Sequence, residues 1–522
     1  MFHPCRCVIR ASHRNVFTDE NKLIIHMSNQ QSHQKTSTVP DTAQNYIGSW
    51  TDPDGEVHEI INPATNQTFA TVTYSTEADV DRTVETAHEA FQDWRKTPVT
   101  ERSQYLFDLK QEVEERHEDI AQALSREHGK TLAEARGEIR RGIENVEVAA
   151  GIPNMTREGS GMVEDVAPGI DETAIRQPLG VFAAITPFNF PAMIPLWFLP
   201  YAVATGNTFI LKPSEKVPLS SRLIFEAVDA VGFPDGVVNL LNGGADTVNA
   251  LLEHDNIEGI SFVGSTPIAK HIYTTAAEHG KRVQAQGGAK NYAVVTESAH
   301  LDEAIPNVIG SVYGNAGQRC LANDVVVGVG DVYDELRERL LSAIDDITVG
   351  SGLNEETDVG PLITDESHNR VNELIEDAIE QGAELAVDGR EFEHLEHPDG
   401  NFMGPVLLED VTTEMDIAQT EIFGPVLCLA DARDLETAIE MVNSTEYGNA
   451  STIYTERGGE AREYRYNVDA GNIGINVGVC APMGFFHFGG RKGSFFGDLH
   501  AQGEDAISFY TEKTIKIERY FS

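Results

Sequence analysis

The spacing of hydrophobic positions divides the chain into a helical first part and a later part in which strands and helices alternate. Residues 76–130 and 134–151 place apolar side chains at helical intervals among acids and alanines, so we expect helices there. From Val181 onward, short apolar runs are followed by helical segments, one of which ends at a glycine. Apolar strands that alternate with helices of this length predict a parallel sheet covered by helices on both faces.

Four strands are predicted in this alternating part, in the runs VFAAIT, NTFILK, VVNLLNGG and GISFVGS. A second alternating region runs from Ala289 to about residue 480. Open sheets of this type bind ligands at the carboxyl ends of their strands, so those ends are where chemistry is expected. Two further stretches alternate apolar with polar residues: 162–180 predicts a two-stranded excursion, and the tail 507–521 predicts a terminal strand.

Charge is the strongest signal in the composition: 83 acidic residues face 39 basic ones, which gives a net charge of −44 over 522 residues. A surface this negative repels nucleic acid and anionic lipid, so neither is expected as a partner. Because concentrated salt screens such self-repulsion beyond about 3 Å, the composition favours a halophilic protein from a salt-rich cytoplasm. An ordinary acidic cytosolic enzyme is the alternative. No apolar run reaches the roughly 20 residues that cross a membrane.

The first residues and the cysteines bear on where the protein works. Residues 1–14 contain three arginines and no acid, and a second methionine, Met27, opens a polar stretch. We interpret 1–40 as a disordered or mis-assigned extension; an organelle transit peptide, also arginine-rich and acid-poor, is the alternative. The five cysteines form neither a disulfide framework nor a metal-ligand pattern. We therefore predict no metal site, and a reducing, cytoplasmic setting.

Polar residues follow the first two strands of the predicted sheet. Asn189 lies between two prolines in TPFNFP, where its amide could donate to an oxyanion, although a turn residue that bonds its own backbone fits equally. Lys212 and Glu215, in LKPSE, suit the ribose hydroxyls of NAD and would reject a 2′-phosphate. Ser214 and Glu215 could instead cap the following helix.

The fourth strand ends at Gly264 and Ser265 in FVGST. Glycine permits close approach to the backbone, and the following helix offers free N–H groups to a pyrophosphate. A lone Gly-Ser pair is weak, but three strand ends that each carry a dinucleotide contact predict a nucleotide site.

Cys320 is the candidate nucleophile. Small residues precede it in GNAGQRC and let a substrate approach the sulfur, and Arg319 beside it favours the reactive thiolate. Cysteines are more often buried and inert, which is the prediction for Cys428 in PVLCLAD, whereas Cys480 fits either description.

PFNFP, LKPSE, FVGST, GQRC and EIFGPV occur in this order, and through them residues 45–519 resemble the aldehyde dehydrogenase superfamily. ITPFNFPAMIPLW, GKRVQAQGGAKN, AGQRC and RKGSFFGD are similar to its CoA-acylating methylmalonate-semialdehyde dehydrogenase subfamily. The resemblance implies an α/β fold with two parallel-sheet domains, one Rossmann-like and one catalytic, plus a β oligomerisation arm, in a homotetramer or a dimer. The implied boundaries are an NAD-binding domain at 41–155 and 178–288, a catalytic domain at 289–485, and an arm at 156–177 and 500–522.

The same resemblance implies roles for individual residues. Cys320 would attack the aldehyde, and the Asn189 amide and the Cys320 backbone N–H would stabilise the oxyanion. Arg319 and Arg141 match arginines that hold the acid group of the substrate, since guanidinium binds carboxylates bidentately; for Arg141 a helix-surface charge is the alternative. The residues implied to bind NAD are Thr186, Phe188, Lys212, Ser214, Glu215, Gly264, Ser265, Glu421 and Phe423.

Gln286 is the informative departure from the family pattern. Most hydrolytic members carry, four residues before the lysine that is here Lys290, a glutamate that activates water. Acylating relatives usually carry asparagine there. Gln286 cannot accept a proton, whereas a CoA thiol needs less help because thiolates are strong nucleophiles.

The sequence therefore predicts oxidation of a small (methyl)malonate-type semialdehyde to an acyl-CoA, with NAD as cofactor and coenzyme A as acyl acceptor. A hydrolytic dehydrogenase that releases a free acid is the first alternative. A binding or structural protein that has lost catalysis is the second.

Overall fold

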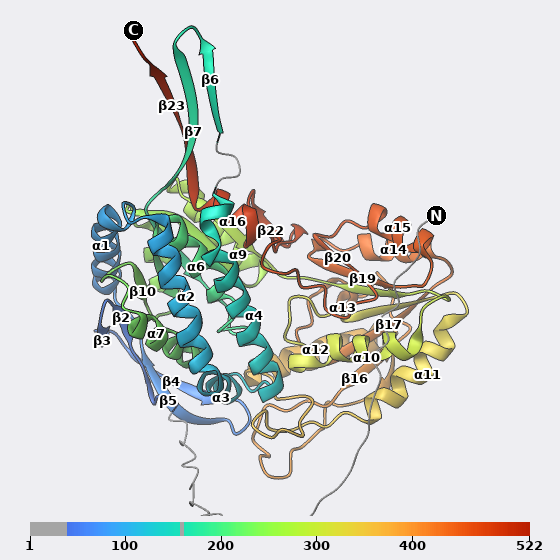
Figure 1. Ribbon diagram of the computed structural model, residues 1–522. Helices are drawn as coiled ribbons and strands as arrows, with labels where there is room; N and C mark the ends of the chain where they lie inside the picture. Colours follow the sequence, from blue (N-terminus) through green and yellow to red (C-terminus); the bar gives the residue numbers. More distant parts are fainter. Residues whose placement is uncertain (1–38, 157–160, 522) are drawn as a thin grey trace, which may run out of the picture. The chain divides into compact units, whose positions relative to one another are not determined.

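The computed structural model describes residues 39–156 and 161–521, and the predicted strands form the centre of its larger sheet (Figure 1). Within these residues that sheet has eight strands. The five central ones, from β12 to β10, run parallel, and antiparallel strands close both edges. In spatial order they are β22 (Phe495–Gly497), β12 (Arg282–Gln286), β11 (Ile257–Val263), β8 (Val181–Ile185), β9 (Thr208–Lys212), β10 (Val238–Leu240), β2 (Asn45–Ile47) and β3 (Trp50–Thr51).

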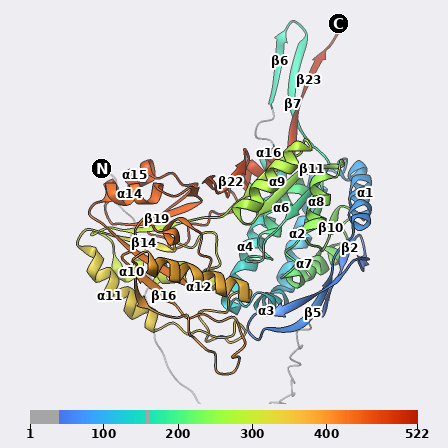
Figure 2. The same ribbon diagram turned by 180° about the vertical axis from the view of Figure 1, so that it is seen from behind.

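Alternate residues of the central strands face two different hydrophobic clusters. Phe182 and Leu211 pack with the helices on one face, and Ala183 and Ile210 pack with α1 (Glu77–Trp94), α8 (Ala245–Glu253) and α9 (Thr266–Glu278) on the other. Figure 2 shows these three helices from behind. Burial of both faces explains why these strands read as continuous apolar runs. The helices around this sheet are α1 (Glu77–Trp94), α2 (Val99–Glu115), α3 (His117–Glu127), α4 (Leu132–Ala150), α5 (Ile152–Met155), α6 (Pro195–Thr205), α7 (Pro218–Val231), α8 (Ala245–Glu253), α9 (Thr266–Glu278) and α16 (Gly503–Phe509).

A second sheet, of seven described strands, has its own hydrophobic core. In spatial order its strands are β15 (Glu384–Val387), β16 (Val406–Glu409), β17 (Val426–Ala432), β14 (Val325–Val329), β13 (Tyr292–Val295), β19 (Ala450–Tyr454) and β20 (Asn472–Ile475); all neighbours are parallel except β15 and β16. The helices that follow these strands are α10 (Leu301–Val312), α11 (Val332–Asp345), α12 (Asp365–Glu380), α13 (Asp416–Gln419), α14 (Leu435–Asn443) and α15 (Gly458–Asn467). The predicted fold class, α/β with two parallel-sheet units, is confirmed.

Three smaller sheets complete the described chain. β6 (Gly161–Ala167) and β7 (Ile170–Pro178) form the predicted hairpin, and β7 also pairs antiparallel with β23 (Thr511–Arg519) along nine residue pairs. This three-stranded sheet carries exposed apolar side chains, among them Val163, Ile515 and Ile517. One of the remaining small sheets contains β1 (Thr42–Ala43), β5 (Gln67–Thr73) and β4 (Val57–Asn62). The other contains β18 (Tyr447–Gly448) and β21 (Arg491–Lys492).

The prediction of one strand across the tail was wrong at its start. Residues up to Phe509 belong to the short helix α16, and the strand begins only at Thr511. Glu504 and Asp505 lie in the first turn of that helix, where the helix dipole favours acids, and Ile507 is buried against the core.

The interpretation of residues 1–40 lies almost wholly outside the described residues, which begin at Val39. Among the residues that are described, no helix has both the length and the apolar character needed to cross a bilayer.

Candidate active site

Cys320 lies where two cavities meet. It lines a cavity of about 360 Å³ next to the carboxyl ends of β8 and β11, and also a second cavity of about 630 Å³ beside α4. The first cavity brings together most of the residues predicted for the cofactor and the oxyanion: Phe188, Asn189, Gly264, Ser265, Glu421 and Phe423.

Four residues predicted for the cofactor lie outside this cavity, at the adjoining ends of β8 and β9. Thr186 and Lys212 are buried, and the N–H of Thr186 donates to the carbonyl of Lys212 over 3.1 Å. The Lys212 Nζ lies 3.2 Å from Oε2 of the partly exposed Glu215, and Ser214 is buried beside them. Because β8 and β9 are parallel neighbours, the two strand ends present these side chains along one edge of the sheet.

Asn189 reaches the Cys320 loop directly. Its side chain is only 4% exposed, and Nδ2 donates to the carbonyl of Gln318 over 3.1 Å. An amide group has two hydrogens, so one remains for a ligand beside Cys320.

The loop before Cys320 has an unusual backbone. Asn315, Ala316 and Gly317 have φ values of 57°, 51° and 71°, all in the left-handed region. A Cβ at Gly317 would lie 1.9 Å from the carbonyl oxygen of Gly424, so only glycine fits there. Strained backbone of this kind is concentrated at functional sites, and here it delivers Cys320 to both cavities.

Burial, and not Arg319, dominates the ionisation of Cys320. Burial first, and then the carboxylate of Glu421, raise the pKa of the thiol to about 12, while Arg319 lowers the pKa by a smaller amount. The guanidinium of Arg319 is already engaged by Oε1 of Glu134 at 2.8 Å. Arg319 therefore favours the thiolate, as predicted, but its effect on the pKa is smaller than that of burial.

Alkylation of Cys320 by iodoacetamide is expected to be slow near neutral pH. With a pKa of about 12 the thiolate fraction rises about tenfold per pH unit throughout the range below it, and only the thiolate reacts. Mass-spectrometric labelling between about pH 7 and pH 10 measures this slope. Glu421→Gln removes a charge that raises the pKa and should accelerate labelling. A labelling rate that levels off below about pH 9 would contradict the expectation.

Glu421 and Phe423 follow α13 and face the first cavity. Oε1 of Glu421 accepts from the N–H of Ala289 over 3.1 Å, and burial raises the pKa of this carboxyl to about 7. Phe423 has a φ of 56°, and its ring packs edge-on against Phe188 at 5.8 Å between centroids. Arg370 of α12 donates to the carbonyls of Glu421 and Ile422 and so fixes this turn.

Arg370 and Ser367 line the same cavity but were not predicted from the sequence. Both lie in α12, where they read as the polar face of an ordinary surface helix, and no motif surrounds them.

Gln286 is the last residue of β12 and is buried, with 3% exposed. Its Nε2 donates to the carbonyl of Phe488 over 3.2 Å, and its Oε1 has no hydrogen-bond partner among the described residues. A neutral amide that is anchored at one end cannot take a proton from water.

The second cavity holds both predicted substrate arginines beside Cys320. Arg141 lies 2.7 Å from Oε2 of Glu144 and also donates to the carbonyl of Pro482 over 2.5 Å. Arg319 is paired with Glu134, as described above. A ligand carboxylate would bind these arginines alongside Glu144 and Glu134, or would replace the two glutamates as their partner. The loop Val479–Pro482 also lines this cavity, but its sequence carries no recognisable motif. The described residues contain no group of three or more side chains that could hold a metal ion.

The family model described as the aldehyde dehydrogenase family matches residues 50–515. A malonate-semialdehyde dehydrogenase of Oceanobacillus iheyensis is 45% identical over 480 residues, which are 92% of this chain and 98% of that protein. A second one, of Shouchella clausii, is 46% identical over 489 residues, 93% of this chain and all of the relative.

Solved structures agree with these relatives. A methylmalonate-semialdehyde dehydrogenase of Oceanimonas doudoroffii matches with a TM-score of 0.91 at 40% identity, over 92% of this chain and 99% of that one. A Sinorhizobium meliloti protein of the same description, solved in complex with NAD, matches with a TM-score of 0.90 at 42% identity, over 92% and 98%. The family prediction is confirmed: the chain is a member of the aldehyde dehydrogenase family.

Proposed function

We propose that the protein oxidises a small malonate- or methylmalonate-type semialdehyde to an acyl-CoA, with Cys320 as nucleophile and NAD as hydride acceptor. The observation that carries the proposal is the place of Cys320 between a cavity with nucleotide-type contacts and a cavity with two arginines. The relatives named for these semialdehydes support the substrate class.

The residues of the first cavity, together with those at the adjoining ends of β8 and β9, fit NAD. Ser265 precedes α9, whose free N–H groups suit a pyrophosphate, and the hydroxyl of Thr186 is buried without a partner among the described residues. Glu215 offers a carboxylate to ribose hydroxyls. When bound, NAD accepts the hydride from the substrate carbon.

Residues of the protein carry out the addition to the aldehyde, the stabilisation of the oxyanion and the binding of the substrate carboxylate. The thiolate form of Cys320 adds to the aldehyde carbon, and the carbonyl oxygen becomes an oxyanion held by the amide of Asn189 and the Cys320 N–H. Loss of hydride leaves a thioester on Cys320. The CoA thiolate then attacks this thioester, its sulfur bonds to the acyl carbon, and the Cys320 thiolate leaves. Arg319 and Arg141 hold the substrate carboxylate.

CoA dependence tests the acyl-transfer step. Wild-type protein with NAD and malonate semialdehyde or its methyl homologue is expected to give steady NADH formation only when CoA is present, because Gln286 cannot activate water. Gln286→Glu is the matched variant, and it should gain CoA-independent turnover. Equal wild-type turnover without CoA would instead show the hydrolytic alternative. NAD binding without NADH formation from any aldehyde would show a protein that has lost catalysis.

We also propose that the protein is halophilic and cytoplasmic. The net charge of −44 supports this, as do the three cysteines within the described residues, which form no disulfide. Dialysis from multimolar salt into dilute buffer is expected to lower both the melting temperature and the activity, since self-repulsion is then unscreened. Full retention of both would contradict a salt-adapted surface.

The sheet of β6, β7 and β23 supports a further proposal, that the chain assembles as a homotetramer, or as a dimer. Its exposed apolar side chains and the free edge of β6 are features that a monomer rarely leaves uncovered. The mass in solution, measured by light scattering, distinguishes these assemblies from a monomer.

A further inference from the structure

Three charged residues behind the reacting loops have no part in the proposed reaction. Lys130 precedes α4, and Glu134 and Glu138 lie in its first turns. The side chains of Lys130 and Glu138 are fully buried, with Nζ and Oε2 2.6 Å apart. An apolar pair of similar size commonly fills such a space without loss of stability. Packing alone therefore does not account for this ion pair.

Lys130 and Glu138 hold the loop that carries Asn189. The Lys130 Nζ donates to the backbone carbonyl of Asn189 over 2.6 Å. Oε1 of Glu138 accepts from the N–H groups of Ala192, over 2.8 Å, and Met193, over 3.1 Å. Hydrogen bonds to charged groups are the stronger kind, so a single ion pair fixes three backbone groups on both sides of Phe190.

Glu134 holds the loop that ends at Cys320. Its Oε1 accepts from the N–H of Asn315 over 2.5 Å and from Nη2 of Arg319 over 2.8 Å. Its Oε2 accepts from the N–H of Thr131, which ties the carboxylate to the start of α4. The N-terminal end of α4 therefore holds both the Asn189 loop and the Cys320 loop through hydrogen bonds.

We propose that Lys130, Glu134 and Glu138 form a positioning clamp that sets the amide of Asn189 relative to the sulfur of Cys320. The proposal rests on the proposed function only in taking these two groups as the reacting pair. The clamp explains why charges are buried at this helix end, because apolar side chains could fill the space but could not orient backbone carbonyl and N–H groups.

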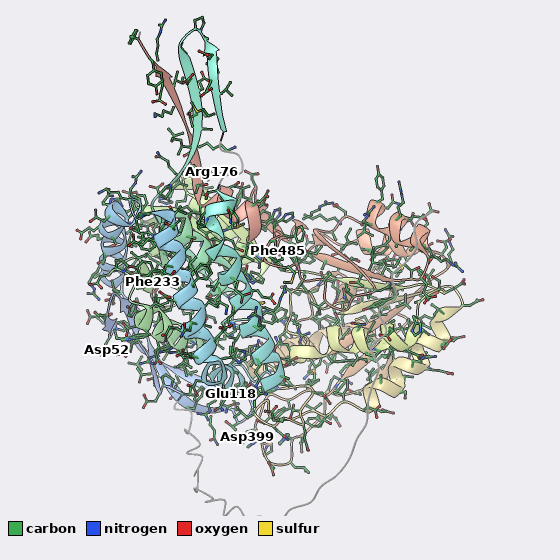
Figure 3. The ribbon with its side chains drawn as sticks, viewed as in Figure 1. Asp52, Glu118, Arg176, Phe233, Asp399 and Phe485 are labelled. Atoms are coloured by element: carbon green, nitrogen blue, oxygen red, sulfur yellow. The ribbon has the colours of Figure 1, made fainter. Side chains whose placement is uncertain are left out.

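The double variant Lys130→Met with Glu138→Leu separates positioning from stability. Removing one partner alone would leave a buried unpaired charge and could unfold the protein, whereas replacing both keeps the site packed. Arg136→Met with Glu118→Leu is the matched control, since this exposed pair joins the same helix to α3 at 2.8 Å. Figure 3 labels Glu118. Each protein is given NAD and malonate semialdehyde, and in a second series propanal, and the first-turnover NADH burst is timed.

We expect the double variant to fold and to keep its KM for NAD, with a melting temperature lowered by the loss of hydrogen bonds to three backbone groups. The burst should slow about 100-fold, because small misplacements of a reacting group have effects of this size. Alkylation of Cys320 by iodoacetamide should be unchanged, because that reaction forms no oxyanion. A merely structural role would lower the melting temperature but leave the burst of the folded protein near the wild-type rate. The control should match wild type in every measurement.

A folded double variant with a burst within about threefold of wild type, well short of the 100-fold loss expected, would overturn the clamp. A wild type without a burst from either aldehyde would defeat the proposed function instead. In that case a crystal structure of the double variant still decides on the clamp: an unmoved Asn189 loop overturns it, and a displaced loop supports it.

Discussion

Replacing Cys320 with alanine is expected to reduce NADH formation by about 10⁴-fold or more, the scale seen when a covalent nucleophile is removed. The sulfur is the only part of the site that can form the thioester, and alanine leaves the rest of both cavities in place. NAD binding, followed by quenching of protein fluorescence, should therefore remain.

Cys480→Ala is the matched control for this variant. Cys480 is also partly buried, and its thiol faces the carbonyl of Asn472. Its replacement should leave turnover near the wild-type value. Turnover of the Cys320→Ala protein above about 1% of wild type, far more than loss of a nucleophile permits, would require another nucleophile and would remove the basis of the mechanism.

Replacing Asn189 with alanine is expected to lower kcat by about 10²–10³-fold, as for other oxyanion donors. The effect should fall on kcat and leave the KM for NAD nearly unchanged, because the amide acts on charge that develops only during reaction. Loss of the hydrogen bond to Gln318 should cost only about 1 kcal/mol of stability.

Single-turnover measurement of NADH formation tests this expectation, with Asn66→Ala as an exposed control. Asn189→Asp keeps the size of the side chain but replaces the donor by an acceptor and should be at least as impaired. If Asn189→Ala retains kcat within about threefold of wild type, well below the effect of losing a donor, the oxyanion is held by other groups.

Site residues were predictable where they directly follow a strand that the sequence pattern makes clear. The strands β8, β9 and β11 are buried on both faces, so their apolar runs stand out, and Asn189, Glu215 and Ser265 follow from their ends. The edge strand β22 was not predicted, because a three-residue FFG run among glycines has no period to recognise. Pairing with β12 alone makes it a strand.

The groups that support the site could not be predicted for a different reason. Glu134 contacts Asn315 across 181 residues of sequence, and Lys130 contacts Asn189 across 59. In the sequence these charges look like the polar face of a surface helix, and only the packing of α4 against the site shows that they point inward. Likewise, the ion pair between Arg319 and Glu134 joins residues far apart in the sequence and could not be predicted from it.

The two cavities that meet at Cys320 have a consequence for the order of events. Under the proposed function, an acyl group on the sulfur would occupy the cavity that holds the arginines and the reduced dinucleotide would leave from the other cavity, so departure of one product would not wait for the other. The covalent intermediate can therefore persist after the dinucleotide has gone. Added NADH should then inhibit competitively against NAD but not against the semialdehyde, whose carboxylate binds the arginines.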